Sequence, residues 1–235
     1  MSFNLFYSPD INDNLQLPEF ESQHCVKVLR MKAGDNLTVT DGKGYFYNCI
    51  LVHADSKNCT VSVLERYEIP AVRNFKLHIA FSPTKQMDRN EWFIEKATEI
   101  GIDRFTPLKS YYSERKDVKT ERLQKIAVAA LKQSQQALLP EIDNQMIFNE
   151  FITKPYKSKK FIAHCHEKPK SPLAKLYNKG EDALILIGPE GNFSENEVED
   201  AINNGFEPIS LGNTRLRTET ACLVAMHTIH VINNQ

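Results

Sequence analysis

The sequence predicts an α/β fold in which a small β-barrel is followed by a parallel sheet with helices, and three observations lead to this prediction. The first 70 or so residues contain short strand-like segments separated by turn signals, a pattern typical of small barrels. From Phe75 onward, short apolar runs alternate with helical patterns, which indicates a mostly parallel sheet with helices on both faces. The segment Pro70–Arg73 reads as a boundary, so we expect domains at residues 1–72 and 73–235.

Three strands and one helix are expected in the N-terminal domain. Asn36–Gly42 alternates in polarity and ends in Asp-Gly, which is a turn signal. Tyr45–Val52 and Cys59–Ile69 are rich in the β-branched and aromatic residues that favour strands. Ser22–Arg30 places its apolar residues on one face, which predicts a short helix.

The C-terminal domain shows five strand-like runs, and each of the last three is followed by a turn and a helical pattern. The expected strands are Phe75–Ser82, Arg104–Ser110, Lys159–Cys165, Asp182–Gly188 and Glu207–Gly212. The expected helices are Asp88–Gly101, Lys119–Leu139 and Thr218–Ile232. The last helix is apolar around most of its circumference, so it must be buried on more than one side. It therefore lies either deep in the fold or across a subunit interface, for which a homodimer is the commonest solution.

The composition is that of an ordinary globular protein, with 41% hydrophobic and 25% charged residues. No apolar run approaches the roughly 20 residues of a membrane span. The N-terminus lacks the basic and then apolar pattern of a signal peptide. The five cysteines are scattered and form no Cys-x-x-Cys pair, which favours reduced thiols. We therefore expect a cytoplasmic protein without a metal site.

Charge is unevenly distributed along the chain. Residues 73–180 carry 21 basic and 12 acidic side chains, whereas residues 181–235 carry 2 and 9. A basic zone of this kind is typical of a nucleic-acid interface. A solvated helix face with local ion pairs explains it equally well, so both interpretations stay open on charge alone.

A glycine-containing loop follows the strand-like run Asp182–Gly188. The loop Gly188–Gly191 contains neither a P-loop nor a Rossmann fingerprint. Glu190 and two glutamates at the following helix start would repel a phosphate, and Ser194 with Glu197 fits a capping box that satisfies helix N–H groups. The loop is therefore expected to bind a neutral or cationic ligand.

A second loop of the same kind spans Leu211–Thr218. Ligands of open α/β sheets bind beyond the carboxyl ends of the strands. The two loops and the turn after Lys159–Cys165 are therefore expected to form one pocket. The alternative is that Gly188 and Gly212 merely permit tight turns. The second loop also holds the only Lys or Arg residues after residue 180, Arg215 and Arg217.

These two loop segments resemble the diagnostic motifs of the ribosomal RNA small subunit methyltransferase E family. "LILIGPEGNFSENEVEDA" and "ISLGNTRLRTETACLVAMHTI" carry the resemblance, and "HCVKVLRMKAGD", "KQMDRNEWFIEKATEIGIDRFTPL", "SERK" and "AALKQSQQALLPEI" match in the family's order. The resemblance covers nearly the whole chain. The family methylates N3 of a uridine in 16S rRNA and belongs to the knotted SPOUT superfamily.

The resemblance implies a PUA-like RNA-binding β-barrel at residues 1–72 and a SPOUT domain with a C-terminal trefoil knot at 73–235. It implies a homodimer that binds S-adenosylmethionine in the knot. On that pattern the cofactor pocket is formed by His164, Leu186, Gly188, Glu190, Gly191, Leu211, Gly212, Leu216, Arg217 and Thr218. The cationic sulfonium of this cofactor agrees with the acidic loop. Three departures from the family pattern are Asn192, Thr214 and Gln136, of which Asn192 tolerates the left-handed backbone of a tight turn.

N3 of uracil carries a proton, so the reaction needs a group that assists its loss or stabilises the resulting anion. The candidates are Arg217 and Arg115, the latter from the facing subunit, unless Arg217 only pairs with Glu190 or Glu219. Glu219 is a candidate general base, or else it caps the last helix.

The expected partner is 16S rRNA or the assembled small ribosomal subunit, and the expected RNA contacts are His24, Arg30, Lys85 and Arg115. His164 and His166 flank Cys165, but no second cluster completes a metal site. A different class of function also fits the chain, namely a non-catalytic RNA-binding factor for assembly of the ribosome. That alternative predicts no affinity for a methyl donor.

Overall fold

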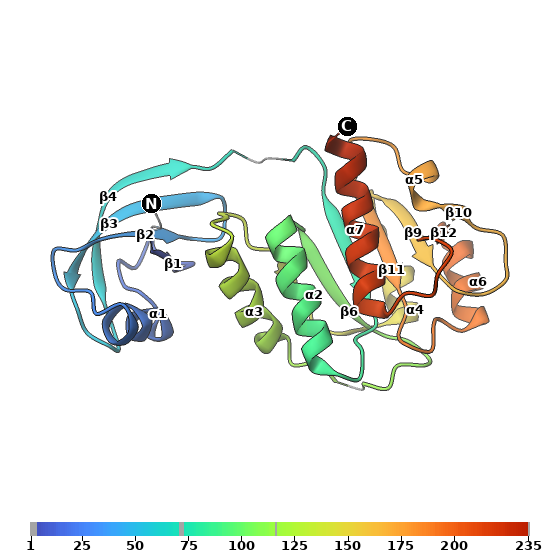
Figure 1. Cartoon of the computed structure of the whole chain (residues 1–235), viewed down its shortest axis with the longest axis horizontal. Coiled ribbons are helices and arrows are strands. Elements are labelled where there is room, and N and C mark those ends of the chain that lie inside the picture. Colours follow the sequence, from blue (N-terminus) through green and yellow to red (C-terminus); the bar gives the residue numbers. More distant parts are fainter. Residues whose placement is uncertain (1–3, 71–72, 116, 235) are drawn as a thin grey trace. The chain divides into compact units, whose positions relative to one another are not determined.

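The structure, a computed structural model, describes residues 4–70, 73–115 and 117–234. Its contacts divide the chain into two compact units, shown by their ribbons in Figure 1. One unit comprises Met1–Val72 with Val128–Leu139, and the other comprises Arg73–Ala127 with Pro140–Gln235. None of the helices described is both long enough and apolar enough to cross a membrane.

The first unit is built on a four-stranded sheet of order β1-β2-β3-β4. β1 runs parallel to β2, and the other pairs are antiparallel. Its elements are β1 (Leu5–Tyr7), α1 (Glu19–Gln23), a π-helical turn η1 (His24–Val28), β2 (Asn36–Thr40), β3 (Tyr45–His53) and β4 (Thr60–Glu68). The three predicted strands are confirmed. The predicted helix is present as α1 and η1, and it begins three residues earlier than expected.

The core of this unit is formed by side chains that point to one face of the sheet. Tyr47, Cys49 and Leu51 of β3 are two residues apart, so they point to one face, and each is almost completely buried. Burial raises the pKa of the Cys49 thiol to about 11 and contributes most to raising that of Cys25 to about 12. Both thiols therefore stay protonated and act as small apolar side chains.

The segment Val128–Leu139 belongs with the first unit, which the sequence did not indicate. The Glu21 carboxylate is completely buried, and Lys132 Nζ lies 2.7 Å from its Oε1 atom. Burial raises the pKa of Glu21, and the Lys132 ammonium opposes that shift. A buried carboxylate without this partner would be strongly destabilising, so Lys132 fixes the segment to the unit.

The predicted helix Lys119–Leu139 is shorter in the structure, where α3 spans Thr120–Gln133. Gln135 has a left-handed backbone with φ of 55°, which ends the helix. The chain then returns to the first sheet, since the backbone N–H of Leu139 donates to the carbonyl of Gly42 at 2.9 Å. Tertiary hydrogen bonds thus override a sequence that favours helix up to Pro140.

A parallel sheet forms the second unit, and every strand pair in its described part is parallel. The strand order is β10-β12-β9-β11-β5-β6-β7, with β8 also paired to β6. The strands are β5 (Leu77–Phe81), β6 (Arg104–Lys109), β7 (Glu141–Ile142), β8 (Met146–Ile147), β9 (Lys159–Ala163), β10 (Ser171–Pro172), β11 (Ala183–Ile187) and β12 (Glu207–Ser210). All five predicted strands are confirmed. The two-residue strands β7, β8 and β10 are too short to give a periodic signal.

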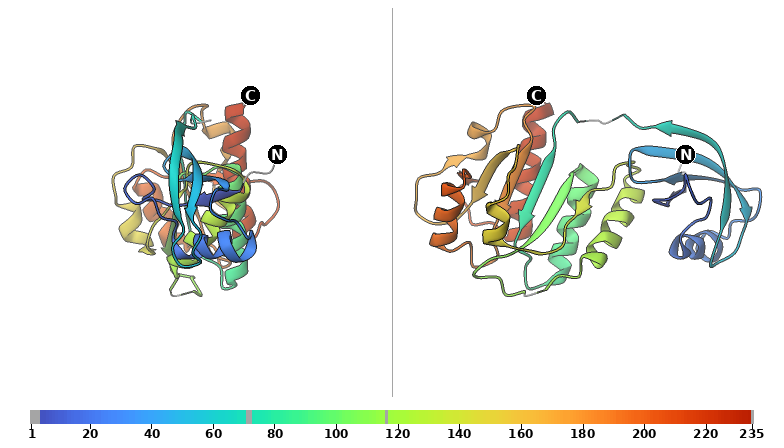
Figure 2. Two further views of the ribbon diagram at one scale, coloured as in Figure 1. Left: turned by 90° about the vertical axis from the view of Figure 1, so that its left-hand side faces the viewer. Right: turned by 180° about the vertical axis from the view of Figure 1, so that it is seen from behind.

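Helices cover both faces of this sheet (Figures 1 and 2). Leu184 and Leu186 of β11 pack in one apolar cluster with α4 and α6, whereas Phe81 of β5 lies edge-on to Phe93 of α2 with ring centroids 5.1 Å apart. α7 packs against α2, α5, β5 and β11. The helices are α2 (Met87–Ile100), α4 (Phe148–Ile152), α5 (Leu173–Leu176), α6 (Glu195–Asn203) and α7 (Thr218–Asn234).

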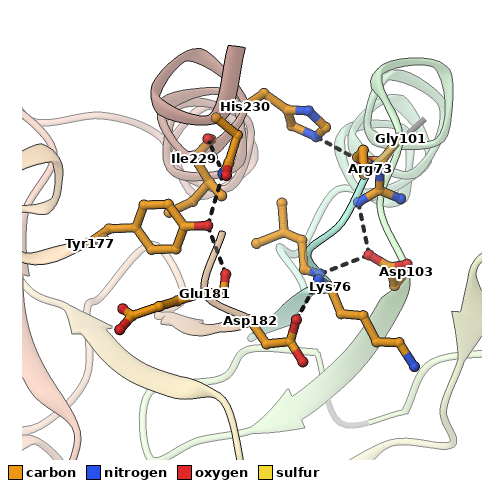
Figure 3. A network of polar contacts seen from close by, with 11 residues as sticks. Arg73, Lys76, Gly101, Asp103, Tyr177, Glu181, Asp182, Ile229 and His230 are labelled. Atoms are coloured by element: carbon orange, nitrogen blue, oxygen red, sulfur yellow. Dashed lines mark hydrogen bonds and ion pairs between the residues drawn. The ribbon is translucent and has the colours of Figure 1, made fainter. Parts of the chain in front are cut away.

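Polar contacts fix the amino ends of the central strands (Figure 3). Asp103 accepts hydrogen bonds from the Arg73 guanidinium at 2.8 Å and from the Leu77 backbone N–H at 2.7 Å. The buried His230 ring of α7 donates to the carbonyl oxygen of Gly101 at 2.7 Å. These bonds hold one edge of the sheet and the final helix in register. The loops at the opposite edge are then left to form a binding site.

Candidate functional site

The carboxyl ends of β9, β11 and β12 open into one cavity of about 660 Å³. These strands are neighbours in the sheet, so the loops that follow them meet at the same edge. The lining residues come from the turn after β9, the glycine loop after β11, and the loop between β12 and α7. The three loops that the sequence predicted to form one pocket therefore do so.

Most residues predicted to bind the cofactor line this cavity. They are His164, Gly188, Glu190, Leu211, Gly212, Leu216, Arg217 and Thr218. Leu186 is not among the lining residues, because strand alternation points it into the core while its neighbour Ile187 faces the cavity. Gly191 also lies outside the lining, packed against Tyr112.

The backbone of the loop after β11 is tightly held. A Cβ atom added to Gly188 would lie 2.9 Å from the backbone nitrogen of Phe193, so no side chain fits there. The buried hydroxyl of Thr218 donates to the Gly188 carbonyl at 2.9 Å, which joins this loop to the start of α7. Asn192 occupies the left-handed region with φ of 69°, and its N–H donates to the Pro189 carbonyl at 2.9 Å. The turn expected from the sequence is therefore formed with asparagine in the position where the family pattern has glycine.

Asn192→Val is expected to lower the free energy of unfolding by about 1–3 kcal/mol, because a β-branched side chain is strained in the left-handed region. Asn192→Gly is expected to change it little, since glycine adopts this conformation freely. Urea unfolding followed by circular dichroism measures both. Asn213→Val is the matched control, because Asn213 is exposed and lacks a positive φ. Equal losses at the two positions would contradict the assignment of strain to Asn192.

His164 brings an unsatisfied polar group to the cavity. Its side chain is buried, only 6% exposed, and neither ring nitrogen has a hydrogen-bond partner among the described residues. Burial, followed by the charge of Lys170 and then that of His166, lowers the pKa of His164 to about 4. The ring is therefore neutral near pH 7 and offers one donor and one acceptor. A buried polar ring without a partner is destabilising, so this position favours a ligand that completes its hydrogen bonds.

The His164 ring is expected to stay uncharged from about pH 8 down to about pH 5.5, whereas an ordinary histidine titrates near 6.5. Ring ¹⁵N chemical shifts measure this, and the spectrum of His164→Gln identifies the signal. Only the folded state resists protonation, so the unfolded state binds more protons in this window. The stability contributed by the neutral ring falls as the pH drops from about 6.5 toward 4. A midpoint near 6.5 in the folded protein would contradict the expectation.

The helix start beside the cavity does not offer free N–H groups to an anion. Ser194 Oγ accepts the backbone N–H of Glu197 at 3.2 Å, and Glu197 Oε2 accepts that of Ser194 at 2.8 Å. The predicted capping box is thus confirmed. Glu190 adds a negative charge, and its carboxylate accepts the backbone N–H of Lys85 at 3.0 Å. The geometry favours a neutral or cationic ligand over a phosphate.

Arg217 lines the cavity with an exposed side chain. Within the described ranges its guanidinium forms no ion pair with either acid that the sequence suggested as a partner. Glu219 lies instead 3.8 Å from Arg89 Nε. Glu219 is buried in the first turn of α7, where the helix dipole favours a carboxylate, and it is not a lining residue. The Arg217 charge is therefore available to a ligand.

Arg115 and Lys85 are adjacent to the cavity rather than part of its lining. Arg115 donates to the carbonyl oxygens of Thr84 at 3.2 Å and Lys85 at 2.5 Å, and Lys85 Nζ lies 2.9 Å from Glu114. These contacts tie the loop after β6 to the loop after β5. The two remaining RNA candidates belong to the first unit, where His24 is half-buried and Arg30 is exposed.

Several lining residues were not singled out from the sequence. They include Lys170, Ser210, Asn213 and Ala221, whereas Cys165 was considered only with its flanking histidines as a possible metal cluster. Lys170 lies between β9 and β10, and its Nζ donates to the His166 carbonyl at 2.5 Å. Ser210, Asn213 and Ala221 lie in the segment that carries the family resemblance, whereas Lys170 lies in no motif and could be indicated only by its place after β9.

Comparisons with known proteins agree over both units. An RNA methyltransferase domain model matches residues 72–230, and an RNA methyltransferase PUA domain model matches residues 17–64. Ribosomal RNA small subunit methyltransferase E from Bacillus subtilis is 31% identical over 226 residues, covering 89% of this chain and 86% of the relative.

Solved structures give the same result. A crystal structure described as a "probable rRNA-methyltransferase from Porphyromonas gingivalis" is 43% identical, with a TM-score of 0.92 over 99% of both chains. Ribosomal RNA small subunit methyltransferase E from Neisseria gonorrhoeae, bound to S-adenosyl methionine, is 26% identical, with a TM-score of 0.86 over 98% of both chains. Sequence, fold and loop arrangement lead to one conclusion: the chain belongs to the ribosomal RNA small subunit methyltransferase E family.

Proposed function

We propose that this chain methylates N3 of a uridine in 16S rRNA with S-adenosylmethionine as methyl donor. The observation that carries the proposal is the cavity formed by the two glycine loops and the buried, unpaired His164. The Neisseria gonorrhoeae relative is bound to S-adenosyl methionine, and the Bacillus subtilis relative is a ribosomal RNA methyltransferase by name.

The residues of the cavity fit this cofactor. Glu190 places a carboxylate near a pocket whose helix start is already capped, which suits a cationic sulfonium better than a phosphate. The neutral His164 ring provides a donor and an acceptor, and the absence of a side chain at Gly188 allows the close turn of the loop that lines the cavity. We propose that the cofactor is held by these residues together with Leu211, Gly212, Leu216, Arg217 and Thr218, and that Leu186 and Gly191 support the loop from outside.

The cofactor supplies an electrophilic methyl group when bound. The chain must then position N3 of uracil and stabilise the charge left when its proton is lost. Among the lining cations, Lys170 and Arg215 donate to backbone carbonyls, whereas the Arg217 guanidinium has no such contact within the described residues, so we assign it the stabilisation of charge on O2 and O4. Glu219 ranks below it as a candidate for general base, because it is buried beside Arg89 and is not a lining residue.

We further propose a homodimer of knotted SPOUT domains. In the described chain, α7 buries one stripe that includes Cys222, Ala225 and Ile229, while Val231 is 41% exposed. An apolar helix with a second, partly exposed side favours a subunit interface. In such a dimer, Arg115 of the partner subunit is a second candidate for stabilising the uracil anion. The domain at residues 1–72 is proposed to bind RNA as a PUA-like module.

Mass spectrometry of 16S rRNA from cells with and without the gene tests the function. The expected result is loss of N3-methyluridine in the deletion strain and its return when the gene is restored. An unchanged level of N3-methyluridine would refute the assignment. Calorimetry with S-adenosylmethionine separates the non-catalytic alternative, because an RNA-binding assembly factor needs no affinity for a methyl donor.

A further inference from the structure

Two neighbouring aromatic side chains are exposed directly after β6. Tyr111 is 76% exposed and Tyr112 is 50% exposed. Their ring centroids are 4.8 Å apart, and the ring planes meet at 86°. A single exposed aromatic needs no explanation, but an edge-to-face pair at one position presents a preformed aromatic surface to solvent.

The backbone beneath this pair is firmly held. The Tyr111 N–H donates to Glu197 Oε1 at 2.7 Å, and Glu197 is the buried carboxylate of the α6 capping box. The Ser110 N–H donates to Ser113 Oγ at 2.9 Å, and the Ser110 hydroxyl lies 2.8 Å from that of Ser82 at the end of β5. The turn is therefore anchored to α6 and to the segment after β5, so the backbone that carries the two rings is fixed in place.

The pair lies beside the cavity. A Cβ atom added to Gly191 would be 3.0 Å from Tyr112 Cβ, so the tyrosine packs directly on the glycine loop. Glu190 and Asn192, on either side of Gly191, both line the cavity. Arg115, four residues after Tyr111, adds a cation to the same loop. The two tyrosine rings and the Arg115 cation thus lie next to the cavity that is proposed to hold the methyl donor.

We propose that Tyr111 and Tyr112 form a stacking surface for an unpaired nucleobase of the RNA substrate, close to the base that is methylated. This inference rests on the proposed function. Proteins recognise unstacked bases by stacking them on aromatic side chains, and an enzyme that modifies a base must take it out of its helical stack. A base displaced beside the target uridine needs such a surface, and the tyrosine pair provides it next to the glycine loop that lines the donor cavity.

Three double variants test the inference. Tyr111→Ala with Tyr112→Ala is expected to weaken binding of unmodified 16S rRNA by about 10- to 100-fold, the usual range for lost base stacking. The two phenylalanine substitutions keep the rings and should restore most of that affinity, whereas the two leucine substitutions keep apolar bulk without an aromatic face and should not. Ile202→Ala is the matched control, because it removes an exposed apolar side chain, 41% exposed, from the same unit.

Affinity for S-adenosylmethionine and oligomeric state are measured on every variant. The expected result is unchanged cofactor affinity with weakened RNA binding in the alanine and leucine variants alone. If the alanine variant binds RNA normally while the wild type methylates it, the stacking surface is refuted and the enzyme assignment stands. If the wild type methylates no RNA, the proposed function is refuted, and the stacking surface that rests on it is refuted with it. A change of oligomeric state in place of RNA affinity would show a subunit contact and also overturn the inference.

Photocross-linking gives an independent measurement. Unmodified 16S rRNA transcribed with 5-iodouridine cross-links preferentially to aromatic side chains that stack on the base. Mass spectrometry of the digested complex is expected to find the modified peptide at residues 110–115. Cross-links confined to other parts of the chain would overturn the inference.

Discussion

Replacing Arg217 by alanine is expected to lower kcat for methyl transfer by about 100- to 1,000-fold, the usual effect of removing one donor that stabilises an anion in a transition state. Arg217 lines the cavity, and its charge is not used by an ion pair in the ranges described. Uracil becomes a nucleophile at N3 only as negative charge accumulates on O2 and O4. A guanidinium stays charged at every pH of interest and can donate hydrogen bonds to either of these oxygens. Single-turnover transfer of a labelled methyl group measures the rate of the chemical step.

Arg215→Ala is the matched control, because Arg215 belongs to the same loop and carries the same charge. Its guanidinium donates to the Glu190 carbonyl at 3.2 Å, so it is engaged with the protein. Its loss is expected to raise KM for RNA more than it lowers kcat, since a phosphate or backbone role affects ground state and transition state alike. Equal losses of kcat in both variants would show a general electrostatic effect. Near-normal transfer by the Arg217 variant, with cofactor affinity intact, would contradict the proposed role.

The pH profile distinguishes a catalytic role from a structural one. At higher pH a larger fraction of uracil loses its N3 proton without help. The deficit of the Arg217→Ala variant relative to wild type should therefore change with pH if Arg217 assists formation of the anion. A loop distorted by the substitution would instead lower the rate by a constant factor at every pH. Lysine at this position keeps the charge but loses the paired donors, so partial recovery is expected.

Local periodicity predicted the sheet and most of its helices, because each depends on residues close in sequence. Ala183–Ile187 is buried at every position, as expected for a central parallel strand, and Ser194 with Glu197 forms the capping box that its spacing indicates. What periodicity leaves open is the face to which each residue points. Leu186 and Ile187 are similar apolar residues, yet only Ile187 faces the cavity. A shift of one residue along the strand therefore decides whether a side chain points into the core or into the cavity.

Contacts between distant segments were not predictable in the same way. The end of α3 at Gln133 depends on a turn at Gln135 and on hydrogen bonds to the first sheet, more than 80 residues earlier in the chain. Tyr111 and Tyr112 carry no motif. Their position is significant only because Glu197 and Gly191 hold them beside the cavity. The loops of the site were recognisable from their sequence pattern. The residues that lie next to these loops in space could be identified only from the structure.

Replacing Gly188 by alanine is expected to weaken binding of S-adenosylmethionine by about 100-fold. The added Cβ atom would lie 2.9 Å from Phe193 N and 3.1 Å from Asn192 C, and both are backbone atoms that no rotamer change can move. The loop must shift, and it carries with it the carbonyl that accepts the Thr218 hydroxyl. Overpacking of this kind costs about 1–3 kcal/mol, and the larger value corresponds to about 100-fold in affinity. Calorimetry measures the dissociation constant at a temperature where both proteins are folded.

Gly212→Ala is the control that separates a steric clash from backbone strain. Gly212 has φ of 132°, but a Cβ atom there would meet nothing within 4 Å. Its loop is exposed and can relax, so we expect about a tenfold loss of cofactor affinity or less. If the cavity depends on the close packing of the Gly188 backbone, alanine at Gly188 must lower the cofactor affinity more than alanine at Gly212 does. The reverse order, or an unchanged dissociation constant for Gly188→Ala, would mean that the ligand is held elsewhere and that the two glycines only permit turns.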